Sequence, residues 1–286
     1  MKKNPIFVVE TETALLPFLL ACFSGKSRNY VKGILKRGQI EIDGTACTDY
    51  ARILYPGQRV EALLHAGPVQ AKLRVPILYE DADIVVIDKP AGMLSISDGK
   101  ESENTAYRIV NDYVRACGGA RVFIVHRLDR ETSGVMLLAK SEQIKHRLQE
   151  NWEASAVRRG YFAVVEGRVQ PPEGNITSWL KQTATLLVYS CGEKGGGKLA
   201  VTNYQTLQAS DAYSLLEVTL ETGRKNQIRV HMKELGHPVA GDKKYGARTD
   251  PFGRLCLHAG VLTVKHPVSG EEMRFASPMP GDWRHR

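Results

Sequence analysis

A charged loop that joins two apolar runs constrains this chain more than any other stretch. The runs, Val122–Val125 and Val135–Ala139, are short and rich in branched side chains, which is typical of buried strands. The loop between them holds Asp129, with Arg127 and Arg130 close by in sequence. Because loops on a rigid scaffold often carry reactive groups, this arrangement predicts a functional carboxylate between two core strands.

A simpler alternative is a surface loop in which Asp129 pairs with a neighbouring arginine for little gain in stability. Gly134 is expected to let the backbone turn tightly into the second strand.

A protein kinase is excluded, because Leu128 separates Arg127 from Asp129 where kinases have His-Arg-Asp. The chain also has no Gly-rich phosphate loop and no Asp-Phe-Gly downstream.

Composition narrows the class of protein. The 286 residues can hold one large domain and a small one, and 43% of them are apolar, enough for a sizeable core. The net charge of +8 favours an anionic partner such as nucleic acid. No apolar stretch is long enough for a membrane span, and none near the start fits a signal peptide. Without a Cys-x-x-Cys pair, the sequence predicts reduced thiols in a cytoplasmic protein.

The first quarter of the chain reads as a small basic module. A helix is expected at Leu15–Phe23, and Ser27 is placed to cap a second helix that ends at Gly38. A strand at Gln39–Ile42 follows, with a turn at Asp43-Gly44. The second helix has no acidic residue and carries several cations that could contact phosphates, with a solvated surface as the alternative. These cations are Lys26, Arg28, Lys32, Lys36 and Arg37.

The remainder predicts more strands than helices. An amphipathic helix is expected at Glu103–Cys117 and a polar one from Ser141 to near Ser155. Strands are expected in neighbouring pairs, at residues 77–79, 84–87, 122–125, 135–139, 158–167, 202–207, 213–221 and 261–264. This order predicts an α+β protein with a mixed, largely antiparallel sheet and flanking helices.

The loop and its second strand resemble the signature of the RluA-type pseudouridine synthases. That motif reads His-Arg-Leu-Asp, two variable residues, Ser-Gly and an apolar run ending in Ala-Lys, and residues 126–140 match it almost throughout. The turn Lys89-Pro90-Ala91-Gly92 also fits the family. The resemblance implies the pseudouridine synthase fold for the larger domain.

Two later segments carry the resemblance further. Tyr161 follows Arg159-Gly160 near the start of a predicted strand and matches the family's second motif, although a strand tyrosine is by default a packing residue. Residues 223–231 resemble the third motif, Gly-Arg-x-His-Gln-Ile-Arg-x-His, in which Arg229 is the basic partner of the carboxylate. Asn226 departs from the usual His there, which puts any acid–base role of that position in doubt.

The N-terminal module is similar to the S-four-type RNA-binding module, a small α/β fold that often precedes RluA-type catalytic domains. The predicted organisation is therefore an RNA-binding module at residues 1–66, a linker at 67–76 and a catalytic domain at 77–286. The resemblance makes phosphate contact the better interpretation of the basic helix.

The resemblance implies isomerisation of uridine within RNA, with no cofactor and no metal. Asp129 is expected to be the catalytic carboxylate, kept ionised by Arg229, while Tyr161 stacks on the base and helps to remove the carbon 5 proton. The target uridine has to leave its stack. Arg127 is expected to fill the vacated space, and Leu257 to pack beneath the base.

Several alternatives remain at this level. Large-subunit ribosomal RNA is the expected substrate of a monomeric enzyme, with tRNA as the second candidate. The chain could instead be a non-catalytic RNA-binding protein or ribosome assembly factor, which would not need Asp129, Tyr161 and Arg229 together. A glycosidase would need a second carboxylate, for which Glu131 is the candidate.

Overall fold

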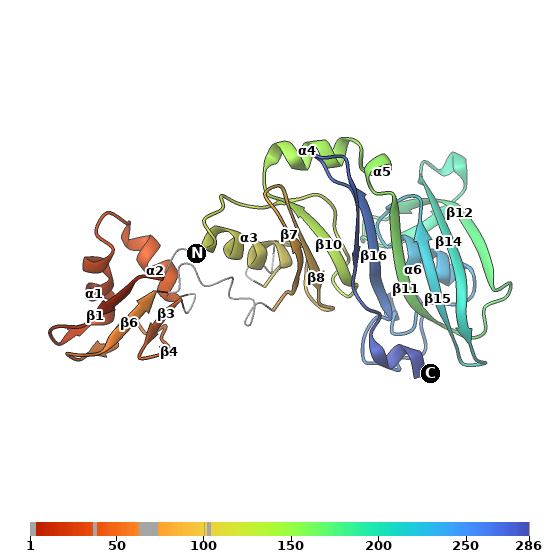
Figure 1. Ribbon diagram of the computed structural model, residues 1–286. Helices are drawn as coiled ribbons and strands as arrows, with labels where there is room; N and C mark the ends of the chain where they lie inside the picture. The colour runs from red at the N-terminus through yellow and green to blue at the C-terminus, as the bar shows by residue number, and fades with distance from the viewer. Residues whose placement is uncertain (1–3, 37–38, 63–73, 100, 102–103, 286) are drawn as a thin grey trace. The chain divides into compact units, whose positions relative to one another are not determined.

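The computed structural model describes residues 4–36, 39–62, 74–99, 101 and 104–285 (Figure 1). The described residues belong to two compact units. Unit 1 comprises Met1–Leu73 and Asp112–Ala120, and unit 2 comprises Arg74–Asn111 and Arg121–Arg286. The expected linker at 67–76 lies largely outside the described residues, so the domain boundary stays a prediction.

Unit 1 contains, in its described residues, a four-stranded antiparallel sheet, a two-stranded ribbon and two helices. The sheet has the order β1-β6-β3-β4, and β2 pairs with β5. The elements are β1 (Ile6–Val8), β2 (Thr13–Ala14), α1 (Leu15–Cys22), α2 (Arg28–Lys36), β3 (Ile40–Ile42), β4 (Thr45–Ala46), β5 (Ile53–Leu54) and β6 (Arg59–Ala62).

Helix α2 forms as its sequence predicts. The Ser27 hydroxyl accepts a hydrogen bond from the backbone N–H of Tyr30 at 3.2 Å and so caps the helix. Three side chains of one helical face are buried in the core of unit 1, namely Val31, Ile34 and Leu35. This burial stabilises a short helix whose other face is polar. Arg37 and Gly38, where the helix was expected to end, lie outside the described residues.

Unit 2 is organised around one large sheet (Figure 1). In the described residues it has eleven strands, in the order β13-β12-β14-β15-β11-β16-β10-β8-β7, with β17 paired to β16 and β9 to β10. The strands are β7 (Ile77–Glu80), β8 (Ile84–Lys89), β9 (Phe123–Ile124), β10 (Ser133–Ala139), β11 (Arg158–Glu166), β12 (Glu173–Gln182), β13 (Val188–Cys191), β14 (Lys198–Ala209), β15 (Tyr213–Leu220), β16 (Leu257–Lys265) and β17 (Glu272–Ala276).

The sheet is mixed and largely antiparallel, as predicted. Strand β10 runs parallel to β16 and antiparallel to β8 and β9, and the other described pairs of this sheet are antiparallel. All seven residues of β10 are buried, which explains why its sequence is an unbroken apolar run rather than an alternating one. The two halves of the sheet meet at the β10–β16 pair.

Gly134 has a different role from the one expected. It lies within β10 at φ +113°, where a Cβ atom would come within 2.2 Å of the backbone oxygen of Ala259. The expectation of a turn into the strand was therefore wrong. The residue lacks a side chain because β10 and β16 approach too closely for one, and because its backbone conformation favours glycine.

Helices flank the sheet of unit 2. α6 (Gln227–Glu234) buries Ile228 and Met232 in a core cluster with residues of β11 and β15, while α4 (Glu142–Glu150) buries Ile144 and Leu148 in a cluster with residues of β8 and β10. The single polar helix expected from Ser141 to Ser155 is instead two. Asn151, at φ −118° and ψ 28°, ends α4, and α5 (Trp152–Ser155) follows. α3 (Ala106–Ala116), which is divided between the two units after Asn111, confirms the expected amphipathic helix.

Three of the described strands of unit 2 were not expected from the sequence, namely β12, β13 and β17. Strand β12 alternates between exposed and partly buried positions, and its outward residues are polar. It has few apolar side chains because it lies near an edge of the sheet, so its pattern resembles that of a loop.

Candidate active site

A pocket of about 370 Å³ opens on the sheet of unit 2 and contains the residues singled out in the sequence. Its floor is made by alternate residues of β16, Leu257, Ala259 and Val261, which share one face because successive strand residues point to opposite faces. Arg159 and Tyr161 add to that floor from β11. Most of the remaining wall comes from the loop before β10, from α5, and from the loop before α6 together with the first turn of that helix.

Asp129 lies in the loop wall of this pocket with its side chain 28% exposed. The loop is held by Ser95, whose hydroxyl donates to the carbonyl of Leu128 at 2.7 Å and accepts from its N–H at 3.1 Å. The Leu128 side chain is buried beneath. These contacts fix the backbone next to Asp129, so the carboxylate has little freedom to leave the pocket wall.

A buried lysine holds the other side of the loop. The Lys89 ammonium donates to three carbonyl oxygens, those of Pro90 at 2.9 Å, Met93 at 2.7 Å and Arg130 at 3.1 Å. Burial lowers the pKa of Lys89 to about 8, partly offset by the charges of Glu131 and Asp129. Sequence reasoning noted the Lys-Pro turn but not this role, because the contact with Arg130 spans 41 residues.

His126 supports the loop as a neutral ring. Its Nε2 accepts a hydrogen bond from the backbone N–H of Leu137 at 3.0 Å, so the proton of the neutral imidazole lies on Nδ1. The ring stacks on Trp152 with the centroids 4.8 Å apart. Burial, and then the charge of Arg159, lower the pKa of His126 to about 4.

Two histidines with a lowered pKa, His126 and His231, are expected to make stability sensitive to acid. The pKa of His231 is also lowered to about 4 by burial, whereas an unfolded histidine titrates near 6.5. Between these values the unfolded chain binds more protons, so the stabilisation is fully present above about pH 6.5 and is lost as pH falls through about 4. We expect the free energy of unfolding to fall by at most about 1.4 kcal/mol per pH unit for each histidine.

Urea unfolding between pH 7 and 4 measures this dependence. His126→Gln should flatten the curve, while the same change at His146, which is exposed on α4, should not. Equal slopes for wild type and His126→Gln would mean that folding does not lower the pKa of His126.

Arg229 lies on α6 beside the carboxylate. Its Nη1 is 3.6 Å from Asp129 Oδ2, and its Nε and Nη2 donate to the two oxygens of Asp242 at 2.6 and 2.7 Å. Burial acts to lower the pKa of Arg229, but the hydrogen bonds and charge of Asp242 outweigh it and raise the pKa above its usual value. The guanidinium is thus held permanently charged, with one nitrogen facing Asp129.

Asn226 contacts Asp129 from the start of α6. We assign its amide with the nitrogen toward Asp129, because the opposite orientation sets the carbonyl oxygen 2.7 Å from a carboxylate oxygen, which outweighs the longer bond of 3.3 Å that this oxygen would accept from Arg229 Nη1. The nitrogen then donates to Oδ2 and Oδ1 of Asp129 at 2.7 and 3.2 Å, and the carbonyl accepts from the Tyr245 hydroxyl at 2.9 Å. Asn226, which stands where the motif usually has histidine, therefore lies directly against the carboxylate.

Tyr161 sits at an irregularity of the sheet. The register between β11 and β16 shifts between Gly160 and Phe162, and such bulges re-aim side chains next to functional sites. Burial raises the pKa of Tyr161 to about 12; the charge of Arg159 acts in the opposite direction and that of Asp129 in the same one. The phenol is therefore protonated at neutral pH.

The structure brings together the predicted catalytic residues and two of the predicted RNA contacts. Asp129, Tyr161 and Arg229 line the same pocket as Leu257, which is buried, and Arg127, which is exposed. The basic-module cations Lys26, Arg28 and Lys32 are exposed in unit 1, and Lys26 lies over the ring of Tyr30 at 5.5 Å. The Lys36 side chain and Arg37 lie outside what the structure describes.

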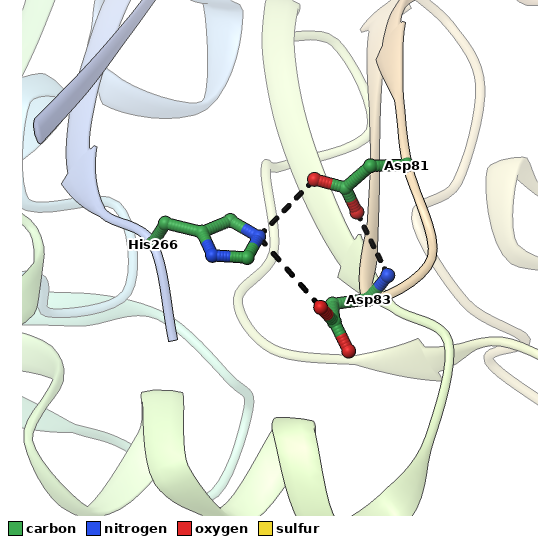
Figure 2. Close-up of side chains that lie close together, drawn as sticks. All are labelled: Asp81, Asp83 and His266. Atoms are coloured by element: carbon green, nitrogen blue, oxygen red, sulfur yellow. Dashed lines mark hydrogen bonds and ion pairs between the residues drawn. The ribbon is translucent and has the colours of Figure 1, made fainter. Parts of the chain in front are cut away.

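A second cluster, Asp81, Asp83 and His266, has the composition of a metal site (Figure 2). Nδ1 of His266 accepts from the backbone N–H of Ser269 at 3.2 Å, which leaves the ring proton on Nε2. That nitrogen donates to Asp81 at 3.1 Å and cannot at the same time bind a cation. The cluster connects the turn after β16 to the turn after β7, so its role is to hold these two turns together.

Comparison with known proteins assigns the family. Residues 83–234, more than half of the chain, match the family described as RNA pseudouridylate synthase. The chain belongs to this family. It is 35% identical over 281 residues to "Uncharacterized RNA pseudouridine synthase YlyB" of Bacillus subtilis, covering 93% of this chain and 90% of that protein. Membership confirms the predicted RluA-type enzyme, an isomerase of uridine in RNA, while the S-four-type module stays a prediction.

Other family members support the same assignment. "Ribosomal large subunit pseudouridine synthase D" of Pseudomonas aeruginosa is 31% identical over 286 residues, covering 91% of this chain and 87% of that one. The structure of "Human RNA Pseudouridylate Synthase Domain Containing 4" superposes with a TM-score of 0.60 at 25% identity, over 73% of this chain and 90% of that one. Among the described helices, none has the length and apolar content needed to cross a membrane.

Proposed function

We propose that this family member converts uridine to pseudouridine in large-subunit ribosomal RNA, with Asp129 as its catalytic carboxylate. One observation carries the assignment of Asp129. Its carboxylate lines a pocket large enough for a nucleobase, faces the Arg229 guanidinium at 3.6 Å and shares the pocket with Tyr161. The substrate follows from the relatives whose names specify the ribosomal large subunit.

The reaction rearranges bonds without a net gain or loss of atoms. The bond between uracil N1 and the ribose breaks, the detached uracil rotates, and a bond forms between ribose carbon 1′ and uracil carbon 5. Carbon 5 then loses its proton, while N1 gains one. Asp129 acts as nucleophile or as stabiliser of the positive charge that develops during cleavage.

Each neighbouring residue has a role that fits its position. Tyr161 stacks on the base, and because its phenol is protonated at neutral pH, it assists removal of the carbon 5 proton as a relay, directly or through water. Arg229 orients Asp129. Leu257 packs beneath uracil and helps to retain it. Exposed Arg127 contacts the RNA at the position in the base stack that the flipped uridine vacates.

The pocket favours isomerisation over hydrolysis. Among the described residues that line it, Asp129 is the only carboxylate, whereas glycosidases use a pair of acidic residues. Glu131, the candidate for the second acid, is exposed and outside the pocket lining. Product analysis separates the classes, because a hydrolase releases free uracil and a non-catalytic binding protein leaves the RNA unchanged.

Mapping of pseudouridines tests the substrate. In RNA from a strain without this protein, we expect one or more pseudouridines of large-subunit ribosomal RNA to be missing and to return when the gene is restored. Loss confined to tRNA would make tRNA the substrate, and an unchanged map would contradict the proposed function. The predicted cytoplasmic location and monomeric state remain predictions of the same proposal.

We also propose that the basic face of α2 binds RNA phosphates. Replacing Lys26, Arg28 and Lys32 with alanine should weaken binding to long structured RNA. It should also lower the slope of log affinity against log salt by about 0.7 to 0.9 for each phosphate that the variant no longer binds. The chemistry of Asp129 should be unchanged once the RNA is bound.

Arg59 provides a matched control in the same unit. It is also exposed, but it pairs with Glu61 at 3.7 Å rather than belonging to the cation-rich helix. Arg59→Ala should leave the salt slope unchanged. Parallel salt dependences for wild type and the triple variant would reduce α2 to a solvated surface.

A further inference from the structure

We propose that Asn226 is a positioning residue that holds the Asp129 carboxylate through a neutral hydrogen-bond donor of fixed direction. This inference rests on the proposed catalytic role of Asp129. Asn226 is buried, and its amide nitrogen lies closer to Asp129 Oδ2, at 2.7 Å, than the Arg229 guanidinium does, at 3.6 Å. The direct hydrogen bond to the carboxylate therefore comes from the amide, and the arginine supplies mainly charge.

The direction of that donor is set by a chain of hydrogen bonds. The backbone N–H of Val188 donates to the Tyr245 hydroxyl oxygen at 3.2 Å. Since that oxygen already accepts, its proton is available to the Asn226 carbonyl 2.9 Å away. With the carbonyl engaged by Tyr245, the amide nitrogen has to face Asp129.

Tyr245 supports both donors that reach the carboxylate. It is buried, and its ring lies under the Arg229 guanidinium, 4.9 Å from centroid to Cζ. Asp242, the bidentate partner of Arg229, also accepts from the backbone N–H of Tyr245 at 3.3 Å. The donors to Asp129 are therefore held on one buried frame from the start of α6 to Tyr245.

The backbone of Asn226 favours its present residue type. It is left-handed, at φ 55° and ψ 20°, a conformation that asparagine, aspartate and glycine tolerate better than most residues. An amide also keeps its protons at every pH, whereas the histidine usual at this position would titrate. The donor to Asp129 thus adds no ionisation to the pH dependence of the reaction.

Two substitutions that suit the left-handed backbone test the proposal. Asn226→Gly removes the donor without backbone strain, and Asn226→Asp has the same shape but donates only when it is protonated. Single-turnover release of tritium from carbon-5-labelled uridine, measured with saturating RNA between pH 5.5 and 8.5, gives the rate, and RNA affinity is measured in parallel.

We expect Asn226→Gly to react roughly tenfold to a hundredfold more slowly at every pH, with RNA affinity unchanged. A decrease of this size corresponds to the loss of one hydrogen bond to a charged group. Asn226→Asp should be slower still at pH 8.5, because two carboxylates repel each other at this distance. Its rate should recover as pH falls and the introduced carboxyl gains the proton that it can donate. Wild type should not show this recovery.

Asn111 provides the control for loss of a buried amide elsewhere. Its side chain accepts from the Val122 N–H at 3.3 Å, and Asn111→Ala should lower the melting temperature without changing the single-turnover rate. If the wild type is active but Asn226→Gly reacts within twofold of its rate, the proposed role of Asn226 is overturned and the proposed function stands. The same conclusion follows if Asn226→Asp has the wild-type pH profile. A wild type that forms no pseudouridine in any RNA overturns the proposed function and this inference together.

Discussion

Asp129→Asn is expected to abolish pseudouridine formation while leaving folding and RNA affinity nearly intact. Asparagine keeps the shape of the side chain but lacks the negative charge and the nucleophilic oxygen that the reaction needs. The loop should hold its position, because Ser95 and Lys89 bind its backbone rather than the carboxylate. Release of tritium from carbon-5-labelled uridine measures turnover.

Glu131→Gln is the matched control, because Glu131 belongs to the same loop but is exposed and does not line the pocket. It should turn over at the wild-type rate. Turnover of Asp129→Asn within about tenfold of wild type, roughly 1.4 kcal/mol of barrier, would remove Asp129 from the mechanism. A large loss in Glu131→Gln would favour a mechanism with two carboxylates.

Tyr161→Phe should retain RNA binding and lose about a hundredfold or more in turnover, the range for removal of a group that takes part in proton transfer. The ring that we propose to stack on the base remains, and only the hydroxyl is removed. Because burial raises the pKa of this phenol to about 12, the wild-type rate should show no rise from phenolate formation between pH 6 and 9. Single-turnover rates across this range measure both effects.

Tyr204→Phe serves as the control on the same sheet. Tyr204 is buried, and its hydroxyl donates to the carbonyl of Pro171 at 3.4 Å, outside the pocket. Its loss should affect stability rather than turnover. An unchanged rate for Tyr161→Phe would make Tyr161 a packing residue, which is the default interpretation of a strand tyrosine.

Local patterns predicted the elements whose burial is uniform or regularly periodic. Strand β10 is buried along its whole length, and α2 buries one face and exposes the other, so both left clear signals in the sequence. The polar strand β12 left no such signal. The break between α4 and α5 at Asn151 was also missed, because asparagine is only a weak helix breaker and tertiary packing decides where such a helix ends.

The sequence by itself determined the family and singled out the residues that we propose for the chemistry, since Asp129, Tyr161 and Arg229 stand in continuous motifs that can be recognised without coordinates. Only the tertiary structure decided how the carboxylate is held. Lys89 reaches Arg130 across 41 residues, Ser95 reaches Leu128 across 33, and Tyr245 reaches Asn226 across 19. Hydrogen bonds depend on distance and direction in space, and no local periodicity records which distant groups the folded sheet will bring within about 3 Å of each other.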